Sequence, residues 1–270
     1  MDIIQALTQE LQVEKWQIEA AVKLIDEGNT IPFISRYRKE ATGSLNDEIL
    51  RNLHERLLYL RNLEDKKKQV LSSIEEQGKL TEELKKSILE AQTLVVVEDL
   101  YRPYRPKRRT RATIAKEKGL EPLANLILLQ MTDKSIEEEA ESYVSEEKEV
   151  KNVKEAIAGA SDILAESVAD EADYRTWIRN KTMKEGMITS EAKDDQAQSV
   201  YENEKSVYEM YYDFEEPISK LAGHRVLALN RGEKEKILTV KINAPEEEIL
   251  SWLKRQVIRT DNPNTTPILE

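Results

Sequence analysis

The 270-residue sequence contains no cysteine, and this absence excludes disulfide bonds, thiol catalysis and the common cysteine zinc sites together. Histidine is almost as scarce, and neither His54 nor His224 has a carboxylate or a second histidine at metal-ligand spacing. The sequence has no run of about 18 uncharged apolar residues that would span a membrane, and its first residues lack the pattern of a secretory signal. These absences predict a cytoplasmic protein with no metal site and no membrane partner.

Glycine and proline are also few, with eight of each, whereas 39% of the residues are hydrophobic and 34% are charged. Such a composition is typical of a helical soluble protein. The formal net charge of -11 argues against a surface that attracts nucleic acid everywhere, so any such binding must be local. P-loop, GxGxxG and GxSxG motifs are missing. We therefore expect no catalytic residues, no cofactor and no small-molecule substrate.

The first 45 residues predict three short helices with tight connections. Gly28 is placed to end the second helix, and Pro32 falls in the first turn of the third. We expect Tyr37 of the third helix to face inward. The pattern is typical of a helix-turn-helix module within residues 1–45. Three cations of the third helix are expected to face solvent: Arg36, Arg38 and Lys39.

A longer uninterrupted segment follows. Residues 47–77 contain no glycine or proline, and leucine and isoleucine recur there at spacings of three and four. This pattern predicts one helix of about 45 Å at ~1.5 Å per residue. The stretch "TLVVVEDLY" at 93–101 fits a buried strand or a buried helix equally well. We expect a mainly α, multi-helix scaffold over residues 1–190.

Residues 191–270 change character. The β-favouring runs "HRVLALN" and "KILTVKI" are joined through "RGEKE", which predicts a β-hairpin over residues 225–242. The tyrosines near residue 210 alternate with carboxylates that would repel phosphate, so we interpret them as packing residues. At Thr266 a helix N-terminus pattern begins four residues before the last residue, Glu270, and we therefore expect a longer protein.

The segment 101–112, "YRPYRPKRRTRA", stands out because it contains no acidic residue. Its prolines forbid regular structure between them, so its cations are expected on an extended loop. Arginine forks at this density suit phosphates, and they suit carboxylates such as those of residues 137–141 or of the long helix equally well. The residues alone leave both interpretations open. We call this stretch the basic segment, and its cations are Arg102, Arg105, Lys107, Arg108, Arg109 and Arg111.

Four stretches resemble the N-terminal half of the Tex family of bacterial transcription accessory proteins. They are "TIPFISRYRKEATGSL" (30–45), "VEDLYRPYRPKRRTRATIAKEKGLEPLA" (97–124), "AIAGASDILAE" (156–166) and "YYDFEEPISKLAGHRVLALNRGE" (211–233). Ser161 stands where the family pattern has arginine. The resemblance implies a helical scaffold that is followed, in full-length relatives, by a ribonuclease-H-like domain, helix-hairpin-helix elements and an S1 domain. The S1 domain is the expected main nucleic-acid binder.

The sequence and the resemblance together predict a non-enzymatic scaffold that acts with nucleic acid, either RNA or DNA, and with the transcription machinery. Most nucleic-acid binding is expected from domains missing from this chain, with residues 191–270 leading into the ribonuclease-H-like domain. Within the chain, the basic segment is the expected phosphate contact or interdomain clamp, and Arg36, Arg38 and Lys39 form a weaker second patch. The alternative is a protein-interaction module with no nucleic-acid binding of its own.

Overall fold

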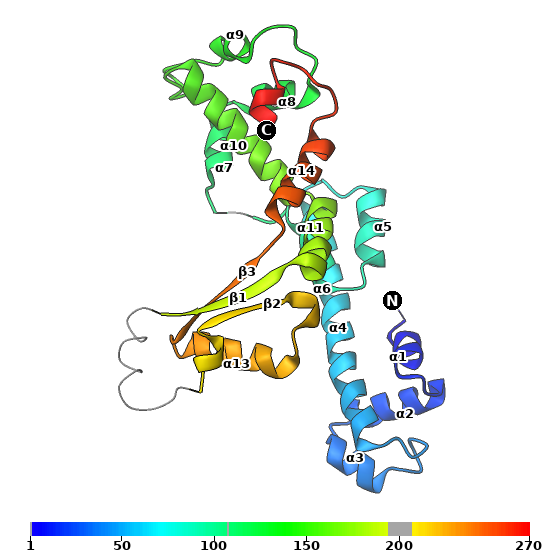
Figure 1. Ribbon diagram of the computed structural model, residues 1–270. Helices are drawn as coiled ribbons and strands as arrows, with labels where there is room; N and C mark the ends of the chain where they lie inside the picture. The colour runs from blue at the N-terminus through cyan, green and yellow to red at the C-terminus, as the bar shows by residue number, and fades with distance from the viewer. Residues whose placement is uncertain (1, 107, 194–206) are drawn as a thin grey trace. The chain divides into compact units, whose positions relative to one another are not determined.

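The computed structural model describes residues 2–106, 108–193 and 207–270, which form two compact units, Met1–Arg105 and Pro106–Glu270. The chain is mainly α, with a small antiparallel sheet in the second unit (Figure 1), and this confirms the predicted fold class. Residue 190, where the sequence suggested a division, lies inside a strand of that sheet, and the division itself stays a prediction. Within the described residues, no helix is long and apolar enough to cross a membrane.

The first unit packs short helices around one long helix. The central α4 confirms the predicted long helix, and its buried stripe carries leucines from Leu50 to Leu63. "TLVVVEDLY" is a helix, α6, whose first turn is capped by the Thr93 hydroxyl. The elements of this unit are α1 (Ile3–Leu11), α2 (Lys15–Asp26), α3 (Ile31–Tyr37), α4 (Asp47–Glu76), α5 (Glu82–Glu90) and α6 (Leu94–Tyr101).

The three short helices α1, α2 and α3 form as predicted, although their helix-turn-helix role stays a prediction. α3 buries Ile34, but the expectation that Tyr37 faces inward is wrong, because its side chain is 68% exposed. Tyr37 follows Phe33 by one turn on the flank of α3, and their ring centroids are 5.4 Å apart. Only the Ile34 side of this short helix reaches the core.

Two bidentate ion pairs fasten α1 and α2 to α4. Arg56 of α4 donates to both carboxylate oxygens of Glu10, and Arg61 donates to both of Asp26 at 2.7 and 2.8 Å. The hydrogen bonds from these arginines lower the pKa of Glu10 and of Asp26 below their usual values. Both carboxylates are therefore held in the charged form.

A buried lysine joins α4 to α5. The Lys67 side chain is 1% exposed, and its Nζ donates to Glu64 Oε1 at 2.9 Å and to the carbonyl of Leu89 at 2.8 Å. Leu89 lies in the last turn of α5, where carbonyl groups have no partner within the helix. Lys67 thus supplies positive charge and a hydrogen bond at the C-terminal end of α5.

The second unit combines helices with the small sheet. Its strand order is β2-β1-β3, and Met187 of the central strand lies opposite Pro217 on one side and Asn243 on the other. Its helices and strands are α7 (Arg111–Glu117), α8 (Glu121–Leu129), α9 (Ile136–Glu141), α10 (Val153–Asp170), α11 (Ala172–Glu185), β1 (Met187–Ala192), β2 (Asp213–Pro217), α13 (Gly223–Lys234), β3 (Leu238–Asn243), α14 (Glu246–Val257) and α15 (Thr266–Leu269).

The predicted β-hairpin over 225–242 is wrong. Its first half is the helix α13, and its second half, β3, pairs with β1 instead. Gly232, taken for a turn residue, lies inside α13, where a Cβ atom would stand 2.6 Å from the Leu238 side chain. His224 accordingly lies exposed in the first turn of a helix, and the expectation that it precedes a strand is wrong as well.

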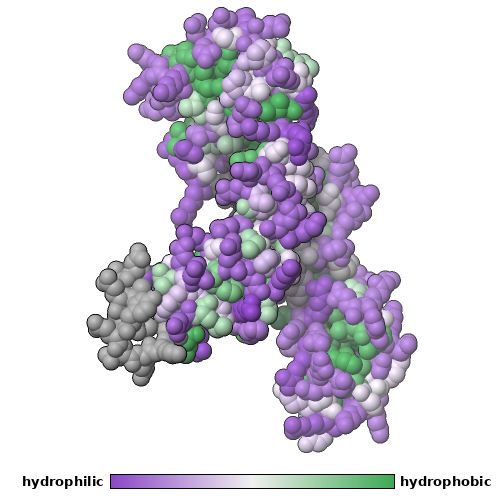
Figure 2. Space-filling model, viewed as in Figure 1, coloured by the Kyte–Doolittle hydropathy of each residue, from purple (hydrophilic) through white to green (hydrophobic). Residues whose placement is uncertain are grey.

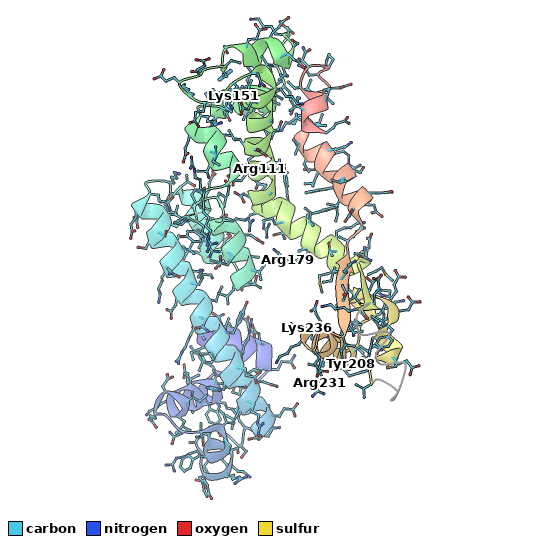
Figure 3. All side chains as sticks on the ribbon, turned by 90° about the vertical axis from the view of Figure 1, so that its left-hand side faces the viewer. Arg111, Lys151, Arg179, Tyr208, Arg231 and Lys236 are labelled. Carbon is cyan, nitrogen blue, oxygen red and sulfur yellow. The ribbon has the colours of Figure 1, made fainter. Side chains whose placement is uncertain are left out.

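The tyrosines near residue 210 do pack, as interpreted from the sequence. Tyr208 and Tyr211 are each 5% exposed and share a small core with Leu229 of α13 and Leu238 of β3. The Tyr208 hydroxyl donates to the Glu235 carboxylate at 2.8 Å, near Arg231 in Figure 3. The rings of Tyr208 and Tyr211 are buried and therefore not available to stack on a base.

Candidate nucleic-acid interface

The basic segment begins at the end of α6, in the first unit. Its tyrosines are tied to α4: the Tyr101 and Ser73 hydroxyls lie 2.9 Å apart, and Gln77 Nε2 donates to the carbonyl of Tyr104 at 2.9 Å. Arg102 caps the C-terminus of α6 and is exposed. The expectation of one extended loop is therefore wrong at this end, because the chain leaves α6 through a hydrogen-bonded turn.

The basic segment continues in the second unit and ends in a helix. Arg108 and Arg109 lie outside any helix or strand and are exposed, whereas Arg111 is the first residue of α7. Thr110 caps α7 by accepting from the Thr113 amide at 3.0 Å, and its hydroxyl donates to Glu166 of α10 at 3.0 Å. Lys107 lies outside the described residues. The loop expectation therefore holds only for the middle of the segment.

Three arginines of the basic segment have carboxylate partners close by. Arg105 lies 3.8 Å from Glu98, Arg109 lies 2.8 Å from Glu117, and Arg111 lies 3.4 Å from Asp162 (Arg111 is labelled in Figure 3). None of these carboxylates belongs to residues 137–141 or to α4. The nearer carboxylates on α6, α7 and α10 compete with phosphate for the guanidinium groups.

These ion pairs leave the arginines accessible. The side chains of Arg105, Arg109 and Arg111 are 65%, 69% and 86% exposed to solvent. Ion pairs at such exposure contribute only about 0–1 kcal/mol each, since water screens them. Arg108 makes no ion pair within the described part of the chain. The basic segment thus retains accessible positive charge that is partly neutralised by its own unit.

The second patch, around α3, has no such neutralisation. Three cations are exposed there, and none of them makes an ion pair with a described residue. The Arg38 guanidinium lies 5.3 Å from the ring centroid of Phe33, and the exposed Tyr37 ring stands next to it. This arrangement combines positive charge with accessible aromatic faces. We call it the α3 cluster: Phe33, Arg36, Tyr37, Arg38 and Lys39.

The chain that follows the α3 cluster is held in place from α2. Gln17 Nε2 donates to the carbonyls of Thr42 and Gly43 at 3.2 and 3.1 Å, and Thr42 is fully buried. Gly43 has φ +60, and a Cβ there would lie 2.5 Å from the Trp16 ring. The loop therefore has one tightly packed conformation, which fixes the backbone that carries Arg38 and Lys39. Gly43 and its neighbours are the supporting residues that sequence reasoning missed.

The acidic and histidine side chains of the described residues are dispersed. No group of three or more acidic or histidine side chains suited to a metal ion occurs among them, and His54 is exposed on α4. Figure 2 shows hydrophilic residues over most of the face turned to the viewer, with hydrophobic residues in separate patches.

These features define a helical scaffold with exposed basic clusters, and comparison with known proteins identifies its family. Residues 1–75 match the Tex-like protein N-terminal domain, and residues 132–261 match the Tex central region. The chain belongs to the Tex family. The α3 cluster falls within the first match, and the basic segment falls between the two.

Named relatives agree with this assignment. The YdcI protein of Bacillus subtilis is 47% identical over 98% of this chain and 36% of its own length, and the transcriptional accessory protein Tex of Neisseria gonorrhoeae is 43% identical over 90% and 31%. S1 RNA-binding domain-containing protein 1 of Homo sapiens is 31% identical over 93% of this chain and 25% of its own length. The chain thus spans roughly a third or less of the curated relatives that it matches.

Proposed function

We propose that this chain binds nucleic acid as part of a Tex-like transcription accessory protein, and that the α3 cluster is its principal contact. The observation that carries the proposal is the lack of neutralisation: Arg36, Arg38 and Lys39 are exposed and make no ion pair with a described residue, in a chain of net charge -11. Phosphate binds more readily to such cations than to arginines that must first leave a carboxylate.

The basic segment is the auxiliary contact in this proposal. Its arginines remain exposed, and each surface ion pair there is weak enough for phosphate to replace it. The names of the relatives support the proposal without extending to this chain: one is called a transcriptional accessory protein, and another an S1 RNA-binding domain-containing protein. RNA or DNA as the ligand, contact with the transcription machinery, a cytoplasmic location and the absence of catalysis are parts of the same proposal.

A second candidate function is that of a protein-interaction module, in which the basic segment braces the fold or clamps domains together. The carboxylates opposite Arg105, Arg109 and Arg111 favour this candidate, because they already satisfy the guanidinium groups. Charge reversal of these arginines would then lower the melting temperature and leave nucleic-acid affinity unchanged.

Fluorescence anisotropy with labelled single-stranded RNA and duplex DNA separates the two candidates. The test variant carries Arg36→Gln, Arg38→Gln and Lys39→Gln, and the matched control carries Arg105→Gln, Arg109→Gln and Arg111→Gln. Both remove three positive charges, so they differ only in which patch they change. We expect the test variant to lose most of its affinity and the control to lose less. Equal losses would refute the ranking of the two patches, and no binding by the unmodified chain would favour the second candidate.

A further inference from the structure

A groove in the second unit points to a function beyond nucleic-acid binding. We infer that the groove formed by α10, α11, α14 and α15 is a docking site for an amphipathic helix of another protein, with an apolar stripe and an acidic flank. The groove encloses about 780 Å³ and is lined mostly by apolar side chains. All four helices belong to one compact unit, so the groove is built without any contribution from the first unit.

The floor of the groove allows an incoming helix to approach closely. α10 contributes Ser161, Ala165 and Ala169, three small side chains at successive turns of one face. Residues four apart lie above one another on a helix, so these side chains form a shallow lane along α10. Helices pack at about 8–10 Å between axes, with the shorter distances reached where side chains are small. A helix laid along this lane would therefore contact both walls.

The walls present apolar side chains that are partly exposed. α14 lines the groove with Leu250, Leu253 and Val257, and Leu250 is 57% exposed. α11 has no buried residue, although it lies between α10 and α14. The rings of Trp177 and Trp252 stack at 4.0 Å with an interplanar angle of 3°, which holds α11 against α14. The stacked rings thus hold α11 and α14 together, while the apolar side chains that face the groove stay partly exposed to solvent.

The positive charge at the groove favours a partner helix that has acidic residues beside its apolar stripe. Arg175, Arg179 and Lys254 line it in a chain whose acidic residues outnumber its basic ones. The single acidic residue of the lining, Glu270, lies 3.4 Å from Lys254 in an exposed ion pair, which is weak enough for a carboxylate of the partner to replace it. Figure 3 labels Arg179 on α11. Basic residues beside an apolar trough complement a helix whose apolar stripe is bordered by carboxylates. The apolar side chains would supply most of the affinity, and the charges would set the orientation and exclude basic helices.

The probe for this inference is a fluorescein-labelled helical peptide of about 18 residues, with leucines at the i, i+3, i+4, i+7 positions and glutamates beside them. A control peptide carries lysines in place of the glutamates. We expect the 270-residue chain to bind the acidic peptide at least about tenfold more tightly than the basic one. Ala165→Trp fills the lane at an exposed position and should abolish binding while the circular dichroism spectrum stays unchanged.

Two charge variants make the test specific. Lys254→Glu places a carboxylate at the groove and should reduce the preference for the acidic peptide, whereas Lys184→Glu, at an 81% exposed side chain away from the groove lining, should not. The inference is overturned if binding survives Ala165→Trp, if both peptides bind equally, or if the acidic peptide fails to bind at about 1 mM. A dimer in sedimentation velocity that Ala165→Trp dissociates would assign the groove to a second copy and overturn it too.

Discussion

Replacing Lys67 by methionine should destabilise the first unit strongly. Methionine keeps most of the apolar stem of a side chain that is 1% exposed, but it removes both hydrogen bonds of Nζ. The carbonyl of Leu89 and the carboxylate of Glu64 then lose this partner. An unsatisfied buried polar group costs about 1–3 kcal/mol, and breaking a buried ion pair costs about 3–5 kcal/mol. Because Glu64 keeps 18% of its exposure, we expect a loss of about 2–4 kcal/mol.

Calorimetry measures this loss directly. For a unit of about this size, each kcal/mol shifts Tm by about 4–8 °C, so the transition of the first unit should fall by about 8–32 °C. Hydrogen exchange should quicken in α5, whose last turn Lys67 holds. The matched control is Lys68→Met at the next position, where the side chain is 77% exposed and lies 3.4 Å from Asp65. It should change stability by less than about 0.5 kcal/mol. If Lys67→Met is as mild as this control, the buried lysine does not fasten α5 to α4.

Three further predictions concern stability. Gly43→Ala should lower the free energy of unfolding, measured by chemical denaturation, by about 2–4 kcal/mol, because the added methyl group clashes with its neighbours and φ is +60. The control Gly28→Ala, at φ +84 in open space, should lower it by about 1 kcal/mol. Similar losses for the two variants would contradict the close packing around Gly43. The double variant Glu10→Gln, Asp26→Asn should be less stable than the unmodified chain at pH values above the unfolded-state pKa values of about 4. This difference in the free energy of unfolding should vanish as the pH falls through the lowered pKa values of the folded state. A difference that persists in acid would refute the assigned ion pairs. Gln130→Met removes the hydrogen-bond partner of the Val257 carbonyl at the end of α14 and of the Arg259 and Thr260 amides that follow it. It should lower the free energy of unfolding by about 2–4 kcal/mol and open this segment to limited proteolysis, and unchanged cleavage would rule out that effect.

Local signals in the sequence predicted the helices well. Residues 47–77 lack glycine and proline and repeat leucine at helical spacing, so one helix was the clear expectation, and α4 ends at Glu76. Pro32 likewise marked a helix start that the structure confirms. Caps and periodicity act within a few residues, so they can be read directly from the chain.

The errors arose where distant residues decide the structure. "HRVLALN" has β-favouring residues, but packing of Gly232 against Leu238 and the pairing of β3 with β1 make it a helix. The carboxylate partner of Arg111 is Asp162, 51 positions away, and no spacing rule indicates such a pair. The cations of the basic segment were therefore visible from sequence, whereas their partial neutralisation, and with it the higher rank that we propose for the α3 cluster, was not.

The salt dependence of single-stranded RNA binding tests the central claim most directly. Three phosphate contacts at the α3 cluster contribute a slope of about -2 to -3 in log K against log salt, at ~0.7–0.9 per contact. The variant with Arg36→Gln, Arg38→Gln and Lys39→Gln should bind more weakly, with a slope shallower by about that amount, while the Arg105, Arg109 and Arg111 variant should keep most of the slope. A slope that the α3 variant leaves unchanged would contradict the claim that these cations contact phosphate.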